Sequence, residues 1–122
     1  MLIYDFSPAV GRDVERFGSR RVKISPILRE TGRLHVACFH LEPGGLIGSH
    51  EATVAQLLLV VRGSGEVTGS ESEPARVGPG CAVFWRGGET HETRAGEDGL
   101  TAIVVEGEEL SPEKVMKLKA GV

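Results

Sequence analysis

The sequence has few cysteines and no long hydrophobic segment. Its two cysteines, Cys38 and Cys81, lie in apolar stretches and are too few for a disulfide framework, so we predict buried, reduced thiols. No uninterrupted apolar run is longer than that of residues 57–61, which is far too short to span a membrane. The first residues do not combine a charged stretch with a long apolar one, which argues against a signal peptide. These absences predict a cytoplasmic protein that does not contact membranes.

An excess of positive charge is also missing. The formal net charge is −3, whereas binding to nucleic-acid phosphates needs a basic face, so we predict no nucleic-acid partner. The local exception is the group Arg16, Arg20, Arg21 and Lys23, which we interpret as a solvated edge.

Common catalytic motifs are absent as well. The chain contains no Ser-His-Asp order and no nucleotide-binding fingerprint. Residues 63–69 are rich in glycine, but no helix with a lysine follows them, which excludes a phosphate-binding loop.

Glycine, in contrast, is abundant: the 122 residues include 17 glycines, scattered without a period. They separate short apolar stretches typical of strands, at residues 22–28, 34–41, 54–61, 81–86 and 100–105. Short strands with turns at this spacing predict an antiparallel all-β sandwich or barrel. The length suits one domain, so we predict a single domain over residues 1–122.

Three local features of this domain can be predicted. Gly87-Gly88 is a candidate two-residue hairpin turn of the primed type, and residues 63–65 are a second candidate hairpin turn. A short helix is expected at about residues 112–119, because Ser111 suits an N-cap and Pro112 the first helical position.

The histidines are the best candidates for chemistry. His50, Ala52 and Gln56 are separated by even numbers of residues, so they face the same way on an extended strand. Glu89 and His91 share a face by the same rule. If the two segments meet in a barrel, His50, Gln56, His91 and Glu89 converge.

The other histidines and the neighbouring aromatic residues have plainer interpretations. His35 and His40 are five residues apart, point to opposite faces of their strand, and are expected to be structural or surface residues. Phe84 and Trp85 are adjacent, so one ring faces inward, where it can line a pocket, and the other faces outward, towards the core or a dimer interface.

Glycines frame both histidines in a recognisable pattern. The first part is Gly44, five residues, His50, then Gln56, six residues and Gly63. The second part is Gly80, five residues, Arg86, Gly88, two residues and His91. Over residues 34–106 this pattern resembles the two motifs of the cupin superfamily, and in particular short single-domain bacterial cupins without a settled activity.

The resemblance implies a fold and an assembly. The fold would be a double-stranded β-helix (jelly-roll) barrel, with its core at about residues 22–106 and a short C-terminal helix. Small cupins commonly pair, so the resemblance also implies a homodimer.

The departures from the cupin pattern weaken its metal site. The family takes three histidines and a glutamate, but here Ala52 occupies the second histidine position and Gln56 the glutamate position. His50 and His91 remain as strong ligands, with Gln56 as a weak one, for zinc, nickel, iron or manganese, or for no metal. The alternative is a two-histidine, one-carboxylate triad in which Glu89 replaces Gln56.

Three classes of function follow. The first is a small-molecule-binding barrel with a degenerate metal site, which holds a polar or anionic ligand against His50, Gln56, His91, Glu89 and an aromatic ring. The second is a cupin enzyme, either a metal-dependent dioxygenase or isomerase that uses His50 and His91 as ligands, or a metal-free enzyme that uses one histidine as acid or base. The third is a structural or regulatory dimer. In the plainest interpretation, both histidines only form hydrogen bonds inside a polar barrel mouth.

Overall fold

The computed structural model describes residues 1–21, 23–28, 32–71 and 73–119. Its regular elements are strands and single turns of 3-10 helix. In chain order they are β1 (Leu2–Asp5), η1 (Pro8–Val10), β2 (Arg12–Asp13), η2 (Arg16–Gly18), β3 (Lys23–Ile24), β4 (His35–Leu41), β5 (Leu46–Glu51), β6 (Ala55–Thr68), β7 (Ala75–Val77), β8 (Cys81–Trp85), β9 (Thr90–Gly107), η3 (Pro112–Lys114) and β10 (Lys117–Leu118).

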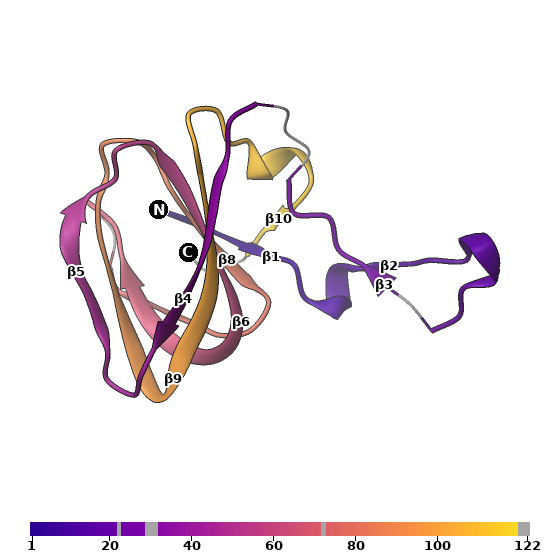
Figure 1. The fold of residues 1–122 in the computed structure, drawn as a ribbon, viewed down its shortest axis with the longest axis horizontal. Helices are drawn as coiled ribbons and strands as arrows, with labels where there is room; N and C mark the ends of the chain where they lie inside the picture. Colours follow the sequence, from indigo (N-terminus) through magenta and orange to yellow (C-terminus); the bar gives the residue numbers. More distant parts are fainter. Residues whose placement is uncertain (22, 29–31, 72, 120–122) are drawn as a thin grey trace.

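One eight-stranded antiparallel sheet curls into a barrel (Figure 1). The strands follow the order β10-β1-β8-β6-β9-β4, with β5 also paired to β9 and β7 to β6. The long strands β6 and β9 serve both halves of the barrel, since β9 pairs with β5 through its first half and with β4 through its second. This is the all-β jelly-roll barrel that the sequence predicts.

The two faces of the sheet bury different apolar clusters. Val60, Val83 and Trp85 belong to the cluster inside the barrel. Leu57, Phe84 and other residues of the opposite face form a second cluster beneath the C-terminal segment. Strand alternation therefore directs Trp85 inward and Phe84 outward.

The chain turns a sharp corner at residues 96–99, where β9 pairs with β6. Gly63 pairs with Leu100 but Gly65 pairs with Ala95, so β9 contains extra residues opposite Ser64. Gly63 and Gly99 have φ angles of 81° and 75°, and a Cβ on Gly63 would lie against the carbonyl oxygen of Gly99. Only glycine permits both this conformation and this close approach.

Two predicted hairpins differ from the structure. Residues 63–65 lie within the continuous strand β6, so the prediction of a hairpin turn there is wrong. Gly87-Gly88 does form a turn, closed by the hydrogen bond from Glu89 N–H to Arg86 O, but only Gly88 has a positive φ. The strands that this turn joins are not neighbours, because β6 lies between β8 and β9.

Predictions for the chain ends and for one cysteine also need correction. The C-terminal helix is a single 3-10 turn, after which the chain extends into β10 and pairs with β1. Of the predicted strand at residues 22–28, residue 22 lies outside the described residues, and within residues 23–28 only β3 is a strand, which pairs with β2 outside the main sheet. Cys81 is buried but Cys38 is exposed, because it lies on the outer face of β4.

A thin arm from η1 to β3 projects away from the barrel (Figure 1). Among the residues whose burial is described, none from 5 to 28 is buried, and the side chain of Phe17 is 98% exposed. No helix in the described ranges has the length and apolar character needed to cross a membrane.

Candidate functional site

His50 and His91 lie side by side in the wall of one cavity, where His91 is buried and His50 is exposed. They are directly paired across β5 and β9, just after a register shift that follows Ile47 in β5. Their ring centroids are 4.5 Å apart, with an angle of 53° between the planes. The structure thus brings together the two histidines that the sequence pattern singles out.

Each imidazole is held by a backbone carbonyl. Nδ1 of His50 lies 2.7 Å from Gly48 O, and Nδ1 of His91 lies 3.1 Å from Glu89 O. A carbonyl oxygen only accepts hydrogen bonds, so Nδ1 carries the proton in both rings. In the neutral form, Nε2 of each ring is left as an acceptor or a ligand atom.

Trp85 packs on the buried side of this pair. Its ring centroid lies 4.5 Å from that of His91, and its Nε1–H donates a hydrogen bond to Thr68 O at 3.0 Å. His91 is only 4% exposed. Burial lowers the pKa of His91 below its ordinary value of 6.5, and the neighbouring His50 lowers it further, against the opposing effect of the hydrogen bond to Glu89 O. His91 is therefore neutral at pH 7.

Gln56 faces the same cavity with a partner that the sequence analysis missed. Its Nε2–H donates a 2.9 Å hydrogen bond to Oε1 of Glu106, the residue paired with it on β9. On the other side of Glu106, Oε2 lies 3.8 Å from Nδ1 of His35 on β4. Cross-strand pairing thus places His35, Glu106, Gln56 and Trp85 in one row across four strands.

These side chains enclose a cavity of about 80 Å³. Its polar lining is His50, His91, Gln56, Thr93 and Glu106, and its apolar lining is Phe39, Ile47, Leu58, Trp85 and Val104. A cavity of this size holds two or three water molecules or a small polar group, taking about 30 Å³ for each water.

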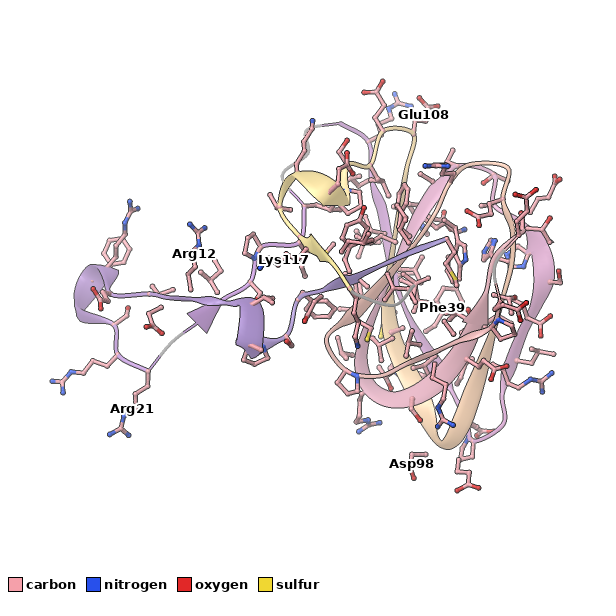
Figure 2. All side chains as sticks on the ribbon, turned by 180° about the vertical axis from the view of Figure 1, so that it is seen from behind. Arg12, Arg21, Phe39, Asp98, Glu108 and Lys117 are labelled. Atoms are coloured by element: carbon pink, nitrogen blue, oxygen red, sulfur yellow. The ribbon has the colours of Figure 1, made fainter. Side chains whose placement is uncertain are left out.

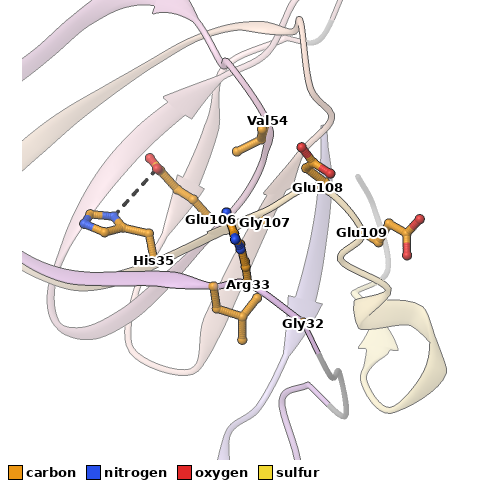
Figure 3. Close-up of a pocket in the computed structure, with 9 residues that line it drawn as sticks. Gly32, Arg33, His35, Val54, Glu106, Gly107, Glu108 and Glu109 are labelled. Atoms are coloured by element: carbon orange, nitrogen blue, oxygen red, sulfur yellow. Dashed lines mark ion pairs between the residues drawn. The ribbon is translucent and has the colours of Figure 1, made fainter.

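A larger cavity of about 670 Å³ lies beside this inner one. Its wall includes Arg33, His35, Glu108 and Glu109 (Figure 3). Glu106 lines both cavities, since one carboxylate oxygen faces Gln56 and the other faces His35.

Two residues of the predicted site lie elsewhere. Phe84 packs in the outer cluster, is 9% exposed and does not line the inner cavity. Glu89 is bound at the turn before β9: its Oε2 accepts from the Met1 ammonium group at 3.0 Å, and its Oε1 accepts from Arg86 N–H at 3.0 Å. Glu89 is thus engaged outside the cavity and forms no triad with the histidines.

The reason that Glu106 escaped prediction is the corner at residues 96–99. Glu106 and His91 are fifteen residues apart, an odd number, which on one regular strand puts them on opposite faces. The extra residues at the corner reverse the alternation, so that both side chains face inward. Glu106 follows Ala102 and Val104 at even spacing, but the sequence does not reveal that this face is the inner one.

A family comparison identifies the fold family. The model of the cupin domain matches residues 37–108, which is more than half of the chain. The chain belongs to the cupin family. This confirms the resemblance inferred from the two glycine-framed motifs.

Solved cupin-like structures share the fold. KdgF from Halomonas sp. is 25% identical, with a TM-score of 0.58 over 69% of this chain and 76% of that protein. A conserved protein of unknown function from Streptococcus pyogenes is 22% identical, with a TM-score of 0.57 over 67% of this chain and 70% of the other. An oxalate decarboxylase variant from Bacillus subtilis is 23% identical, with a TM-score of 0.58 over 70% of this chain but only 24% of that protein. A comparison with proteins of curated function gives no match.

Cupins often bind metal ions, but the donors of this cupin do not fit a tightly held one. No group of three or more His, Cys, Asp or Glu side chains within the described ranges is arranged to hold a metal ion. Glu106 lines the cavity with the two imidazoles, but it is not grouped with them around a common metal position, and the Gln56 amide oxygen is a weak ligand for first-row divalent metals.

Proposed function

We propose that this cupin binds a small polar molecule in the cavity that His50 and His91 line. One observation carries the proposal: two imidazoles with fixed tautomers lie 4.5 Å apart in the cavity wall, on a base formed by Trp85. Convergent polar groups in an apolar pocket are typical of ligand sites. Histidines that only filled space would not need an open cavity beside them.

The cavity volume limits the part of the ligand that enters. About 80 Å³ accommodates a head group of a few non-hydrogen atoms, and the larger cavity beside Glu106 accommodates the rest of the molecule. A four-carbon chain with a polar group at each end is therefore a suitable probe.

The chain contains a single tryptophan, so its fluorescence reports on the cavity directly. We would titrate the protein with 1,4-diaminobutane, erythritol and succinate, three four-carbon compounds with cationic, neutral and anionic polar groups. At least one should change Trp85 emission saturably, with a dissociation constant in the range of about 1 mM that few-atom ligands reach.

The same titrations on His50→Ala and His91→Ala should lose this response. His40→Ala is the matched control, because His40 lies on the exposed outer face of β4 and does not line the cavity. If none of the three compounds binds the unmodified protein, or if both cavity variants bind them unchanged, the proposed function is wrong.

A metal-dependent cupin enzyme, a dioxygenase or an isomerase, is the alternative function. The two unprotonated Nε2 atoms favour it, whereas no third His, Cys, Asp or Glu in the described ranges is arranged with both histidines to hold a metal, which disfavours it. Protein purified without an affinity tag should contain metal well below one equivalent. Stoichiometric zinc, nickel, iron or manganese that disappears in both His50→Ala and His91→Ala would instead establish the enzyme class.

We also propose that the chain forms a homodimer through its arm. The arm, residues 8–24, carries five Lys or Arg and two Asp or Glu residues, whereas the whole chain has a net charge of −3, so its charge complements the barrel of a second copy. Phe17 at the tip of the arm is free of contacts that would bury it in its own chain. Light scattering should give a molar mass of two chains for the native protein, and Phe17→Ser should lower this mass towards that of a single chain. A monomeric native protein would contradict the proposal.

The cytoplasmic location and the lack of a nucleic-acid partner stay predictions.

A further inference from the structure

We infer that the head group held by the inner cavity is a cationic hydrogen-bond donor, a primary ammonium group, and that Glu106 is the residue that selects it. This inference rests on the proposed function, because it names the chemistry of the ligand for the same cavity. It differs from the sequence-based expectation, which also allowed an anionic ligand.

The histidines offer acceptors to this cavity. Both Nδ1 protons are engaged with backbone carbonyls, those of Gly48 and Glu89. Neither Nε2 atom has a hydrogen-bond partner among the residues that the structure describes. A ligand that meets these atoms must supply the hydrogen itself.

The remaining polar groups of the cavity add acceptors. Gln56 directs its amide nitrogen to Glu106, and its amide oxygen has no hydrogen bond from a residue that the structure describes, so it can accept one from a ligand. The Trp85 indole N–H donates away from the cavity, to Thr68 O. Thr93 supplies a hydroxyl, which can accept as well as donate.

The charge of the cavity has one sign. Among the described residues, Glu106 is the only Asp or Glu that lines it, and neither Lys nor Arg does. An anionic head group would therefore lose its hydration against a carboxylate and without a compensating cation, at a large cost in free energy. An ammonium group instead gains charge-assisted hydrogen bonds to Glu106 and an attractive contact with the rings of Trp85 and Phe39.

The larger cavity favours the same class of ligand. Among the described residues that line it are three carboxylates, Glu106, Glu108 and Glu109, and one permanent cation, Arg33. Because Glu106 belongs to both cavities, a ligand with its ammonium head in the inner cavity extends directly into this acidic outer one. A diamine places one ammonium group in the inner cavity and the other in the acidic outer cavity.

The comparison of 1,4-diaminobutane with succinate tests this inference, in about 0.15 M salt so that long-range surface charge is screened. The diamine should change Trp85 emission saturably and at least about tenfold more tightly than succinate, a difference of 1.4 kcal/mol. Glu106→Gln keeps the shape of the side chain and removes its charge, so it should weaken diamine binding about tenfold.

Asp98→Asn is the matched control for this loss of charge. Asp98 is exposed at the corner of residues 96–99, at the opposite end of the barrel from Glu108 (Figure 2). Its substitution by asparagine should therefore leave diamine binding unchanged. The inference would be overturned if succinate bound more tightly than the diamine, or if erythritol alone bound. It would also be overturned if Glu106→Gln and the native protein bound the diamine equally. Succinate or erythritol binding that depends on His50 and His91 would still support the proposed function, so the two failures can be told apart.

Discussion

The two ends of β9 each bring a carboxylate close to a histidine, yet the two carboxylates have different surroundings. At the start of the strand, Glu89 is bound by the Met1 ammonium group and by the backbone N–H groups of Arg86 and Ser70. At the end, Glu106 has one hydrogen bond among the described residues, from Gln56, and a 3.8 Å contact with His35 Nδ1, and its side chain is 32% exposed. Several donors fix Glu89 in the fold, whereas Glu106 keeps acceptor capacity for a ligand.

The difference shows that proximity to a histidine does not make a carboxylate part of a site. Glu89 is two residues from His91, and its backbone carbonyl accepts a hydrogen bond from the ring, whereas its carboxylate is bound outside the cavity. Glu106 is fifteen residues from His91 and lines the same cavity. The number of donors already bound to each carboxylate separates the structural residue from the candidate binding residue.

The corner at residues 96–99, which places both ends of β9 on the inner face, should be disrupted by one methyl group added at Gly63. Gly63→Ala should destabilise the barrel by about 3 kcal/mol or more, because it adds the cost of a positive φ to a contact with the Gly99 carbonyl. Urea unfolding measures this loss. Gly48→Ala is the control, since a Cβ there meets nothing within 4 Å. Equal stability of the two variants would show that the corner adapts to a side chain.

Glu89 itself should matter mainly for stability. Glu89→Gln removes the charge that partners the buried Met1 ammonium group and weakens the hydrogen bonds from backbone N–H groups, at a cost of about 2 kcal/mol. Thermal and urea unfolding should show this loss while the Trp85 response to 1,4-diaminobutane stays unchanged. Glu92→Gln, in a weak surface pair with Arg94, should change stability little. A loss of ligand binding in Glu89→Gln would place Glu89 in the site after all.

The contribution of Glu89 should also depend on pH in a defined direction. Burial alone would raise the pKa of Glu89, but hydrogen bonds from the Met1 ammonium group and from Arg86 N–H outweigh it and hold the pKa below its ordinary value of 4.5. The unfolded chain therefore takes up the proton first as the pH falls, so this stability is complete above pH 4.5 and disappears below it. The difference in unfolding free energy between the native protein and Glu89→Gln should shrink over that range. A constant difference down to acidic pH would refute this origin.

Glu106 should show the smallest effect on stability. Glu106→Gln keeps an oxygen that accepts from Gln56 and affects a partly exposed side chain, so it should change the unfolding free energy by less than about 1 kcal/mol. Unfolding of this variant beside Glu89→Gln makes the comparison direct. A loss from Glu106→Gln as large as that from Glu89→Gln would mean that Glu106, too, is a structural residue.

The strands and the motif histidines could be predicted because both depend on local sequence. Residues 34–41 and 81–86 were predicted as strands almost to the residue, since glycine-bounded apolar stretches leave few other conformations. The turn at residues 63–65 was mistaken for a hairpin because glycines at a strand bulge give the same signal as glycines in a turn. The C-terminal helix failed because β1 offers Lys117 and Leu118 an edge to pair with, and that contact is remote in sequence.

By itself, the sequence determined the all-β fold, the cupin motifs and the positions of His50, Gln56 and His91, because alternation and glycine spacing act over a few residues. Only the tertiary structure decided that Trp85 rather than Phe84 faces the cavity, and that Glu106 rather than Glu89 supplies its carboxylate. The physical reason is the corner at residues 96–99, where extra residues in β9 reverse the alternation. The face on which Glu106 lies is fixed by pairing with β6, and that pairing joins residues far apart in the chain.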